Sequence, residues 1–187
     1  MARGKEKRPA ELLVDKVRDA HRAKGGRLVV LIDGPAASGK TTLGEELAYL
    51  LKAQLVSMDL FYPGWGGLEV GSAMIAGSVL DPQEPGWRRW DWSNGKAAEW
   101  HKVNPKKDIV IEGSGALSAA NKALATYTVW IHVELAERKR RKQLRDGTIN
   151  MEHWDYWAMQ ERAFFQRERP DQLADIVYNG MTGELIE

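Results

Sequence analysis

Residues 27 to 42 read Arg-Leu-Val-Val-Leu-Ile-Asp-Gly-Pro-Ala-Ala-Ser-Gly-Lys-Thr-Thr, and this stretch decides the fold. The segment from Gly34 to Thr41 matches the pattern G-x-x-x-x-G-K-[ST] at every fixed position. A triphosphate presents a row of anionic oxygens, so its site needs converging backbone N–H groups and a mobile cation. Glycines at both ends let the backbone wrap closely because they lack a Cβ. The pattern therefore predicts a phosphate-binding loop.

The flanking residues support this prediction. The apolar run at 28–32 is typical of a strand that is buried on both faces. Leu43, Leu47 and Leu50 follow the loop at helical spacing. An incidental glycine-rich turn is the alternative, but the motif requires strand, loop and helix in this order, and all three are present.

The loop predicts Mg-ATP as the cofactor. Lys40 would supply the cation for the γ-phosphate, the Thr41 hydroxyl would hold Mg²⁺, and the helix that starts near Gly39 would point its positive end at the phosphates. The residues expected to bind the nucleotide here are Gly34, Ala36, Ala37, Ser38, Gly39, Lys40, Thr41 and Thr42.

Composition excludes several classes of function. The 187 residues suffice for one domain with its own core. Lys and Arg number 27 against 26 Asp and Glu, so no global basic field favours nucleic acid or an anionic membrane. The absence of cysteine removes disulfides, thiolate catalysis and cysteine-based zinc sites. No apolar run approaches the length of a membrane span, and we expect a cytoplasmic protein.

Strands alternate with helices along the chain, which predicts an α/β three-layer sandwich, a parallel sheet covered by helices on both faces. We expect a flexible basic tail at 1–8 and a single domain at 9–187, with an acceptor-binding region at about 58–104. The expected strands are 27–33, 54–57, 108–112, 127–133 and 175–178, and the expected helices are 9–24, 40–53, 93–102, 117–125, 134–145 and 152–169.

Three segments together resemble the uridine kinase and nucleoside monophosphate kinase branch of P-loop proteins. They are the loop with its preceding Asp33, the segment Ser57–Tyr62, and Val110–Gly113. The resemblance implies a P-loop kinase fold, an Asp near the acceptor hydroxyl, a third-strand acid that arranges Mg²⁺ through water, and a mobile Arg-rich lid. Uridine kinases often have two adjacent acids after the second strand, whereas this chain has Asp59 alone, between Met58 and Leu60.

Two carboxylates follow strands at the edge where open α/β sheets bind ligands. Asp59, just past the second strand, would accept a proton from an attacking hydroxyl, contact the acceptor or hold a metal-bound water. Turn capping is its alternative role. Glu112, at the tip of the third strand, would contact the substrate or act as an outer ligand of Mg²⁺. A purely structural carboxylate is the alternative there.

A strongly basic helix follows the fourth strand, where the kinases that the chain resembles have their lid. Arg138, Arg141 and Arg145 share one helical face and would neutralise charge on the transferred phosphoryl group. We expect a lid at about 134–150, with Arg141 and Arg145 on phosphates and Arg138 against the nucleobase. A solvated basic face is the alternative.

Residues 87–92 read Trp-Arg-Arg-Trp-Asp-Trp, and this alternation suits an acceptor that has a planar ring and an anion. Arg88 and Arg89 are the expected contacts, with Tyr62 and Trp65 on the opposite wall, although half-buried strand packing would give the same pattern. By resemblance, Asn179 would lie near adenine. The four histidines lack metal-ligand spacing, and the aromatic residues of 151–165 favour core packing.

Three functional hypotheses follow. The first is a kinase that transfers the γ-phosphoryl group of Mg-ATP to a small-molecule hydroxyl, with a nucleoside-like acceptor favoured. The second is a nucleoside monophosphate kinase, in which Arg88 and Arg89 would clamp the acceptor phosphate. The third is a nucleotide-dependent switch, although the segment 121–124 lacks the Asp of the guanine-binding motif. We expect a small-molecule partner and no nucleic acid or membrane, and a homodimer is left open.

Overall fold

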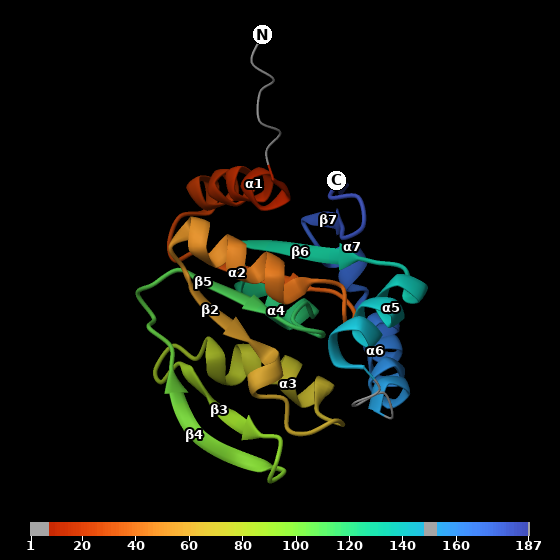
Figure 1. Ribbon diagram of the computed structural model, residues 1–187. Helices are drawn as coiled ribbons and strands as arrows, with labels where there is room; N and C mark the ends of the chain where they lie inside the picture. The colour runs from red at the N-terminus through yellow and green to blue at the C-terminus, as the bar shows by residue number, and fades with distance from the viewer. Residues whose placement is uncertain (1–7, 148–152, 187) are drawn as a thin grey trace.

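The apolar run at the start of the motif forms the centre of a six-stranded sheet. In the computed structural model, which describes residues 8–147 and 153–186, all five residues of β1 (Val29–Asp33) are buried. β1 lies between β5 (Ile109–Glu112) and β6 (Tyr127–His132) and is parallel to both. The other strands are β2 (Gln54–Ser57), β7 (Ile176–Asn179) and β8 (Leu185–Ile186), and the order is β2-β5-β1-β6-β7-β8. Figure 1 labels β2, β5, β6 and β7 of this sheet. Only β8 runs antiparallel to its neighbour.

Helices cover both faces of this sheet, as expected. Val30 and Ile32 of β1 belong to a core formed with α1 (Pro9–Lys24) and α2 (Lys40–Leu51). Val29 and Leu31 point to the other face and belong to a second core. The helices that cover this second face are α3 (Leu68–Met74), the π-helix Ile75–Val79, α4 (Ala119–Leu124), α6 (Trp154–Glu168) and α7 (Pro170–Leu173). The sequence prediction of a three-layer α/β fold is confirmed.

The helix predicted over 93–102 is wrong. Residues of this segment form β4 (Lys96–Lys102), which pairs antiparallel with β3 (Gly86–Asp91) in a separate two-stranded ribbon. Asp91 accepts backbone N–H bonds from Ser93 and Asn94, and Gly95 adopts a positive φ of 60°. Asp, Asn and Gly at these positions favour a hairpin turn, which outweighs the helical spacing of the apolar residues.

Two segments of the predicted organisation lie partly outside the described residues: 1–7 of the expected tail and 148–150 of the expected lid. Arg8 is described and directly precedes α1. Its side chain forms ion pairs with Glu11 of α1 and with Glu46, a residue of the segment 40–51. The basic helix of the expected lid is α5 (Leu135–Asp146), directly after β6. Among residues 8–147 and 153–186, no helix is long and apolar enough to cross a membrane.

Candidate active site

The phosphate-binding loop joins β1 to α2 and depends on its glycines. Gly34 has a φ of 156°, and a Cβ there would lie 2.7 Å from the Ile131 carbonyl oxygen. Gly39 caps α2 with a φ of 101°, a conformation that residues with a side chain rarely adopt. The loop therefore passes close to β6 and turns sharply into α2, which directs the helix N-terminus at the space above the loop.

The loop residues present the donors that ATP needs. Lys40 is 8% exposed, and its Nζ donates to the Pro35 carbonyl at 3.0 Å and lies 3.3 Å from Ser114 Oγ. Ser38 is buried, and its hydroxyl has no hydrogen-bond partner among the described residues. The Ser38 hydroxyl, buried without a partner in the described part of the chain, and the Lys40 ammonium, in the same loop, are donors that an anion can accept from. The residues present therefore suit a triphosphate.

Glu112 and Thr41 lie together beside the loop. The Thr41 hydroxyl donates to Glu112 Oε1 at 3.3 Å, and Glu112 is 2% exposed. Burial raises the pKa of Glu112, and the Lys40 ammonium opposes this rise. Gly113 lets this strand tip pass close to Met58, because a Cβ there would lie 2.5 Å from Met58 Cβ. A hydroxyl and a carboxylate that touch in this way suit Mg²⁺, which takes few protein ligands and completes its shell with phosphates and water.

Asp33, the last residue of β1, is fully buried beneath the loop. Its carboxylate accepts backbone N–H bonds from Gly34 at 2.6 Å, Leu117 at 2.8 Å and Gly115 at 3.0 Å. Burial raises the pKa of Asp33 to about 7, although these three donors and Lys40 act in the opposite direction. Asp33 therefore joins the loop, at Gly34, to the segment after β5, at Gly115 and Leu117, through hydrogen bonds.

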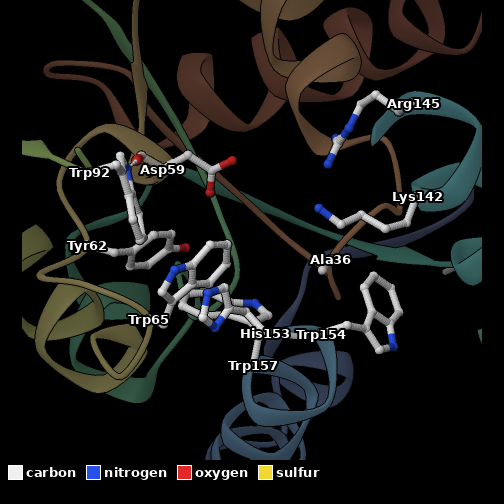
Figure 2. A pocket seen from close by; sticks show the side chains of 10 residues that line it. All are labelled: Ala36, Asp59, Tyr62, Trp65, Trp92, Lys142, Arg145, His153, Trp154 and Trp157. Atoms are coloured by element: carbon white, nitrogen blue, oxygen red, sulfur yellow. Dashed lines mark hydrogen bonds between the residues drawn. The ribbon is translucent and has the colours of Figure 1, made fainter. Parts of the chain in front are cut away.

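A cavity of about 400 Å³ opens beside the loop, and Asp59 lies on its wall (Figure 2). Asp59 belongs to the short helix Met58–Leu60 that follows β2. Ala36 of the loop and Lys142 and Arg145 of α5 line the same cavity. The charge of Asp59 raises the pKa of Glu112, so the two carboxylates interact across the site. The structure thus brings together the loop and the acid that sequence reasoning placed beside it.

Aromatic rings form most of the remaining wall. Trp65 stacks on His153, with ring centroids 4.4 Å apart, and lies 5.0 Å from the ring of Trp92. Figure 2 shows that these rings gather on the Asp59 side of the cavity. The Trp92 indole donates to the Asp59 carbonyl at 3.0 Å. Its N–H is therefore already engaged, and the ring offers an apolar surface.

Tyr62, expected to contact the acceptor, also lines this cavity. It is 1% exposed, and its hydroxyl donates to the Ser114 carbonyl at 2.7 Å. Burial raises the pKa of Tyr62 well above its ordinary value, so the phenol stays protonated. The residue contributes its ring edge to the cavity and its hydroxyl to the fold.

Three of the four arginines of α5 approach the site, in different ways. Arg141 donates to the carbonyl groups of Ser38 at 3.3 Å and Gly180 at 2.9 Å, which places its guanidinium on the phosphate-binding loop. Arg145 lines the cavity. Arg138, expected near the nucleobase, is instead largely buried and lies over the ring of Trp154 at 5.8 Å.

Arg88 and Arg89 do not line the cavity that contains Asp59. Arg89 pairs with Glu99 on the neighbouring strand, with Nε and Oε1 2.6 Å apart, and Arg88 donates to the Ala98 carbonyl at 3.2 Å. Both side chains therefore make contacts within the β3–β4 ribbon. From the Trp-rich segment, only Trp92 reaches the cavity wall.

Asn179 ends β7 on the other side of the loop. Its side-chain oxygen accepts backbone N–H bonds from Met181 at 2.9 Å and Thr182 at 3.2 Å, so it stabilises a turn. A Cβ on the adjacent Gly180 would lie 3.1 Å from the Ser38 carbonyl oxygen. The turn thus borders the loop, while the Asn179 side chain is already engaged.

Several cavity residues were missed or given another role by sequence reasoning. His153, Trp154 and Trp157 line the cavity, although the sequence pattern indicates core packing for the two tryptophans and no ligand role for the histidine. The two tryptophans are also buried, which explains why their periodicity indicates a core face. Their position at the start of α6, right after the expected lid, is the signal that could have identified them.

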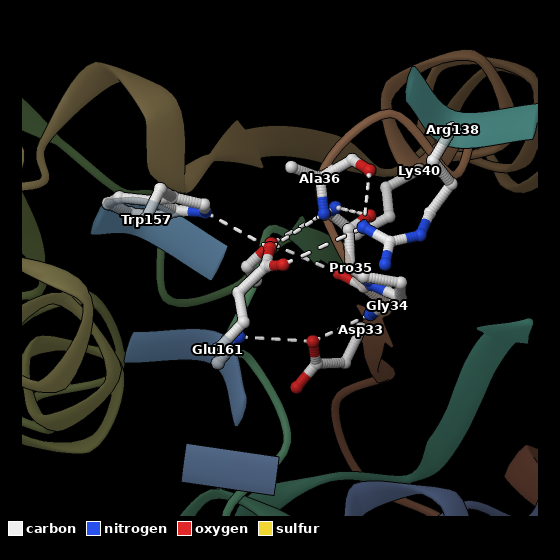
Figure 3. A network of polar contacts seen from close by, with 10 residues as sticks. Asp33, Gly34, Pro35, Ala36, Lys40, Arg138, Trp157 and Glu161 are labelled. Carbon is white, nitrogen blue, oxygen red and sulfur yellow. Dashed lines mark hydrogen bonds and ion pairs between the residues drawn. The ribbon is translucent and has the colours of Figure 1, made fainter. Parts of the chain in front are cut away.

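Glu161 of α6 is the most extensively bonded acid near the loop (Figure 3). It is 2% exposed, and its Oε1 accepts from the Ala36 backbone N–H at 2.6 Å and from the Trp157 indole N–H at 3.0 Å. Ser114 Oγ lies 2.9 Å from the same oxygen.

Comparisons with known proteins identify the fold. No model of a known protein family matches the chain. Shikimate kinase from Corynebacterium diphtheriae is 28% identical over 149 residues, which cover 75% of this chain and 80% of that protein. The structure of a possible uridine kinase from Bacillus stearothermophilus superposes with a TM-score of 0.64 at 18% identity, covering 91% of this chain and 97% of that one. Shikimate kinase from Bacteroides thetaiotaomicron gives 0.50 at 16% identity, covering 82% and 86%. The chain therefore has the fold of the P-loop kinases, which these similar proteins share.

Proposed function

We propose that this protein is an ATP-dependent kinase that phosphorylates a hydroxyl group of a small molecule. The observation that carries the proposal is that Ala36 of the phosphate-binding loop and Asp59 line the same cavity. A donor site and a proton acceptor that share one cavity are what phosphoryl transfer to a hydroxyl requires. The kinase names of the similar proteins support the reaction class.

The proposal gives the main polar residues of the site separate parts in this reaction. ATP with Mg²⁺ supplies the phosphoryl group and the charge that neutralises its oxygens. Lys40 and the loop amides would hold the phosphates, and Thr41 would hold the metal, with Glu112 beside it. Arg141, already on the loop, and Arg145, on the cavity wall, would stabilise the charge that develops during transfer.

Asp59 would accept the proton that the acceptor hydroxyl loses as its oxygen bonds to phosphorus. The Asp59 side chain is exposed to the cavity, where an acceptor can reach it. Closure of α5 over the site would exclude water, because an open site would hydrolyse ATP. We therefore retain the Arg-rich lid as part of the proposal.

A nucleoside-like acceptor is our first choice, because tryptophan faces dominate the wall beside Asp59. Flat rings stack on such faces, whereas a compact polyol needs hydrogen-bonding groups around it. A hydroxyl acceptor is also favoured over a monophosphate, because Arg88 and Arg89 make contacts within the ribbon and do not line the cavity. Shikimate remains the competing acceptor, since a shikimate kinase is among the relatives.

A substrate panel tests this proposal. The protein would be incubated with Mg-ATP and nucleosides, nucleoside monophosphates, shikimate or simple sugars, with ADP release followed and the products identified by mass spectrometry. A phosphorylated nucleoside is the expected result. Phosphorylated shikimate would keep the kinase and overturn the acceptor. ATP hydrolysis that no compound stimulates would favour a nucleotide-dependent switch.

A further inference from the structure

The third residue of the phosphate-binding loop, Ala36, is held on both sides by charged side chains from two helices. Glu161 of α6 accepts the Ala36 N–H at 2.6 Å. Arg138 of α5 donates to the Ala36 carbonyl at 3.3 Å. The two charged groups are 3.8 Å apart, and their side chains are 3% and 12% exposed. We call Glu161 and Arg138 the Ala36 clamp (Figure 3).

The clamp also reaches the ammonium of the loop. Ser114 Oγ lies 2.9 Å from Glu161 Oε1 and accepts from Lys40 Nζ at 3.3 Å. One hydroxyl therefore separates the Glu161 carboxylate from the Lys40 cation. A change at Glu161 would shift both the loop backbone and the ammonium that ATP must attract.

Each member of the clamp contacts a tryptophan of the cavity wall. Glu161 accepts from the Trp157 indole N–H at 3.0 Å, and the Arg138 guanidinium lies over the Trp154 ring at 5.8 Å. Both rings line the cavity that contains Asp59. The clamp thus joins the nucleotide side of the site to the acceptor side.

A buried ion pair that served stability alone would satisfy all of its donors. Here the Nε of Arg138 is buried without a hydrogen-bond partner among the described residues, and burial lowers the pKa of Arg138 despite the nearby Glu161. The pair contacts both the N–H and the carbonyl group of Ala36, while Arg138 Nε has no hydrogen-bond partner among the described residues. This favours a role in positioning the loop.

We infer that the Ala36 clamp positions the phosphate-binding loop for Mg-ATP and couples nucleotide binding to the tryptophan wall of the acceptor cavity. Glu161 and Arg138 are positioning residues in this inference, which rests on the proposed function for the identity of the nucleotide. The coupling works in both directions, because any ligand that moves Ala36 moves the partners of Trp154 and Trp157.

Mg-ATP binding measured by calorimetry tests the clamp without any acceptor. Glu161→Gln keeps an oxygen for the Ala36 N–H but removes the charge that faces Arg138, and it should weaken binding about tenfold. Arg138→Gln should do the same, and the double variant should also be weaker by about tenfold rather than a hundredfold. Glu168→Gln is the matched control, since Glu168 lies on the same helix and accepts from the Ala119 N–H. The control should bind as the wild type does.

Tryptophan emission supplies a readout that a purely structural pair would not change. Mg-ATP should alter the emission of the wild type more than that of Trp157→Phe, and Glu161→Gln should reduce the change to the Trp157→Phe level. Wild-type affinity together with a wild-type emission change in Glu161→Gln would overturn the clamp. Arg138→Gln covers the case in which the Glu161 variants fail to fold, because wild-type affinity in that variant also overturns the clamp.

These outcomes separate the clamp from the proposed function. A wild type that binds Mg-ATP and phosphorylates no acceptor would refute the kinase, while the affinity differences would still support the clamp. A kinase with acceptor turnover whose Glu161 and Arg138 variants bind Mg-ATP normally would refute the clamp alone.

Discussion

Lys40 is almost wholly buried, and its ammonium is bonded within the loop to Pro35 and lies close to Ser114. Neither contact involves a carboxylate, so the positive charge remains available to an anionic ligand. The cation that the pattern G-x-x-x-x-G-K-[ST] predicts is therefore the Lys40 ammonium, which lies within the loop. Its charge is the largest electrostatic contribution that a single side chain of this loop can make to the transferred group.

Lys40→Ala should abolish phosphoryl transfer, lowering kcat by about a thousandfold or more, because γ-phosphate stabilisation is lost. The rate of product formation with the best acceptor from the panel measures this effect. Lys96→Ala, at the exposed start of β4, is the control and should leave the rate unchanged. Turnover of Lys40→Ala near the wild-type rate would refute the role of the loop.

Asp59→Asn should bind Mg-ATP normally and lose at least about a hundredfold in kcat, because the amide cannot accept the acceptor proton. Calorimetry gives the binding and the coupled assay gives the rate. Asp81→Asn provides the comparison, since Asp81 accepts from the N–H groups of Gln83 and Glu84 in an exposed turn and does not line the cavity. An unchanged rate for Asp59→Asn would remove Asp59 from the role of base.

Asp33 predicts a dependence of stability on pH. Its pKa is raised from 3.8 to about 7 in the folded protein, so its contribution to stability is full below about pH 4 and is lost as the pH rises through 7. Asp33→Asn lacks this titration. The unfolding free energy of the wild type minus that of Asp33→Asn should therefore fall over this range, as urea titrations at several pH values would show. A difference that stays constant or rises would contradict the shift.

At the level of elements, strands and helices that depend on local pattern could be predicted from the sequence. β1, the loop and α2 follow from an apolar run, two glycines and leucines at helical spacing. β4 could not be predicted in this way, because its residues have helix-compatible spacing and the turn before it fixes a hairpin. Asp91, Asn94 and Gly95 are the residues of the sequence that favour this turn.

Some residues of the candidate site could likewise be predicted from the sequence, and others could not. The loop, Asp59 and Glu112 could be placed because each follows a strand, and parallel strands end at one edge of the sheet. Glu161 and Trp157 could not be placed, because only packing shows which face of α6 meets the loop. The sequence also could not show that the Arg88 side chain lies away from the cavity. Its direction depends on the contact with Ala98 on the neighbouring strand.

The loop glycine at position 34 gives a prediction at the element scale. Gly34→Ala would place a Cβ 2.7 Å from the Ile131 carbonyl oxygen, so β1 and β6 must separate or the loop must shift. We expect a loss of about 1–3 kcal/mol in unfolding free energy together with weaker Mg-ATP binding. Gly77→Ala is the control, because no atom lies within 4 Å of a Cβ there, and its stability should stay close to that of the wild type. Equal stability of the two variants, measured by urea unfolding, would contradict the close approach.

At the level of the whole molecule, the fold is shared with kinases whose names specify different acceptors. The similarity to the possible uridine kinase extends over 91% of the chain at only 18% identity, so it fixes the architecture and leaves the acceptor open. The tryptophan wall beside Asp59 lies next to the P-loop edge of the sheet. Under the proposed function, the wall would select the acceptor, and the edge would carry out the transfer.

The most direct measurement follows the γ-phosphoryl group itself. The protein would be incubated with Mg-ATP labelled at the γ-phosphate and a mixture of small metabolites, with Lys40→Ala in parallel, and the labelled products would be separated and identified. The proposed function predicts that the label moves to a hydroxyl of one small molecule with the wild type and stays on ATP with the variant. Label that appears only as inorganic phosphate, or never leaves ATP in the presence of wild-type protein, would contradict the assignment as a small-molecule kinase.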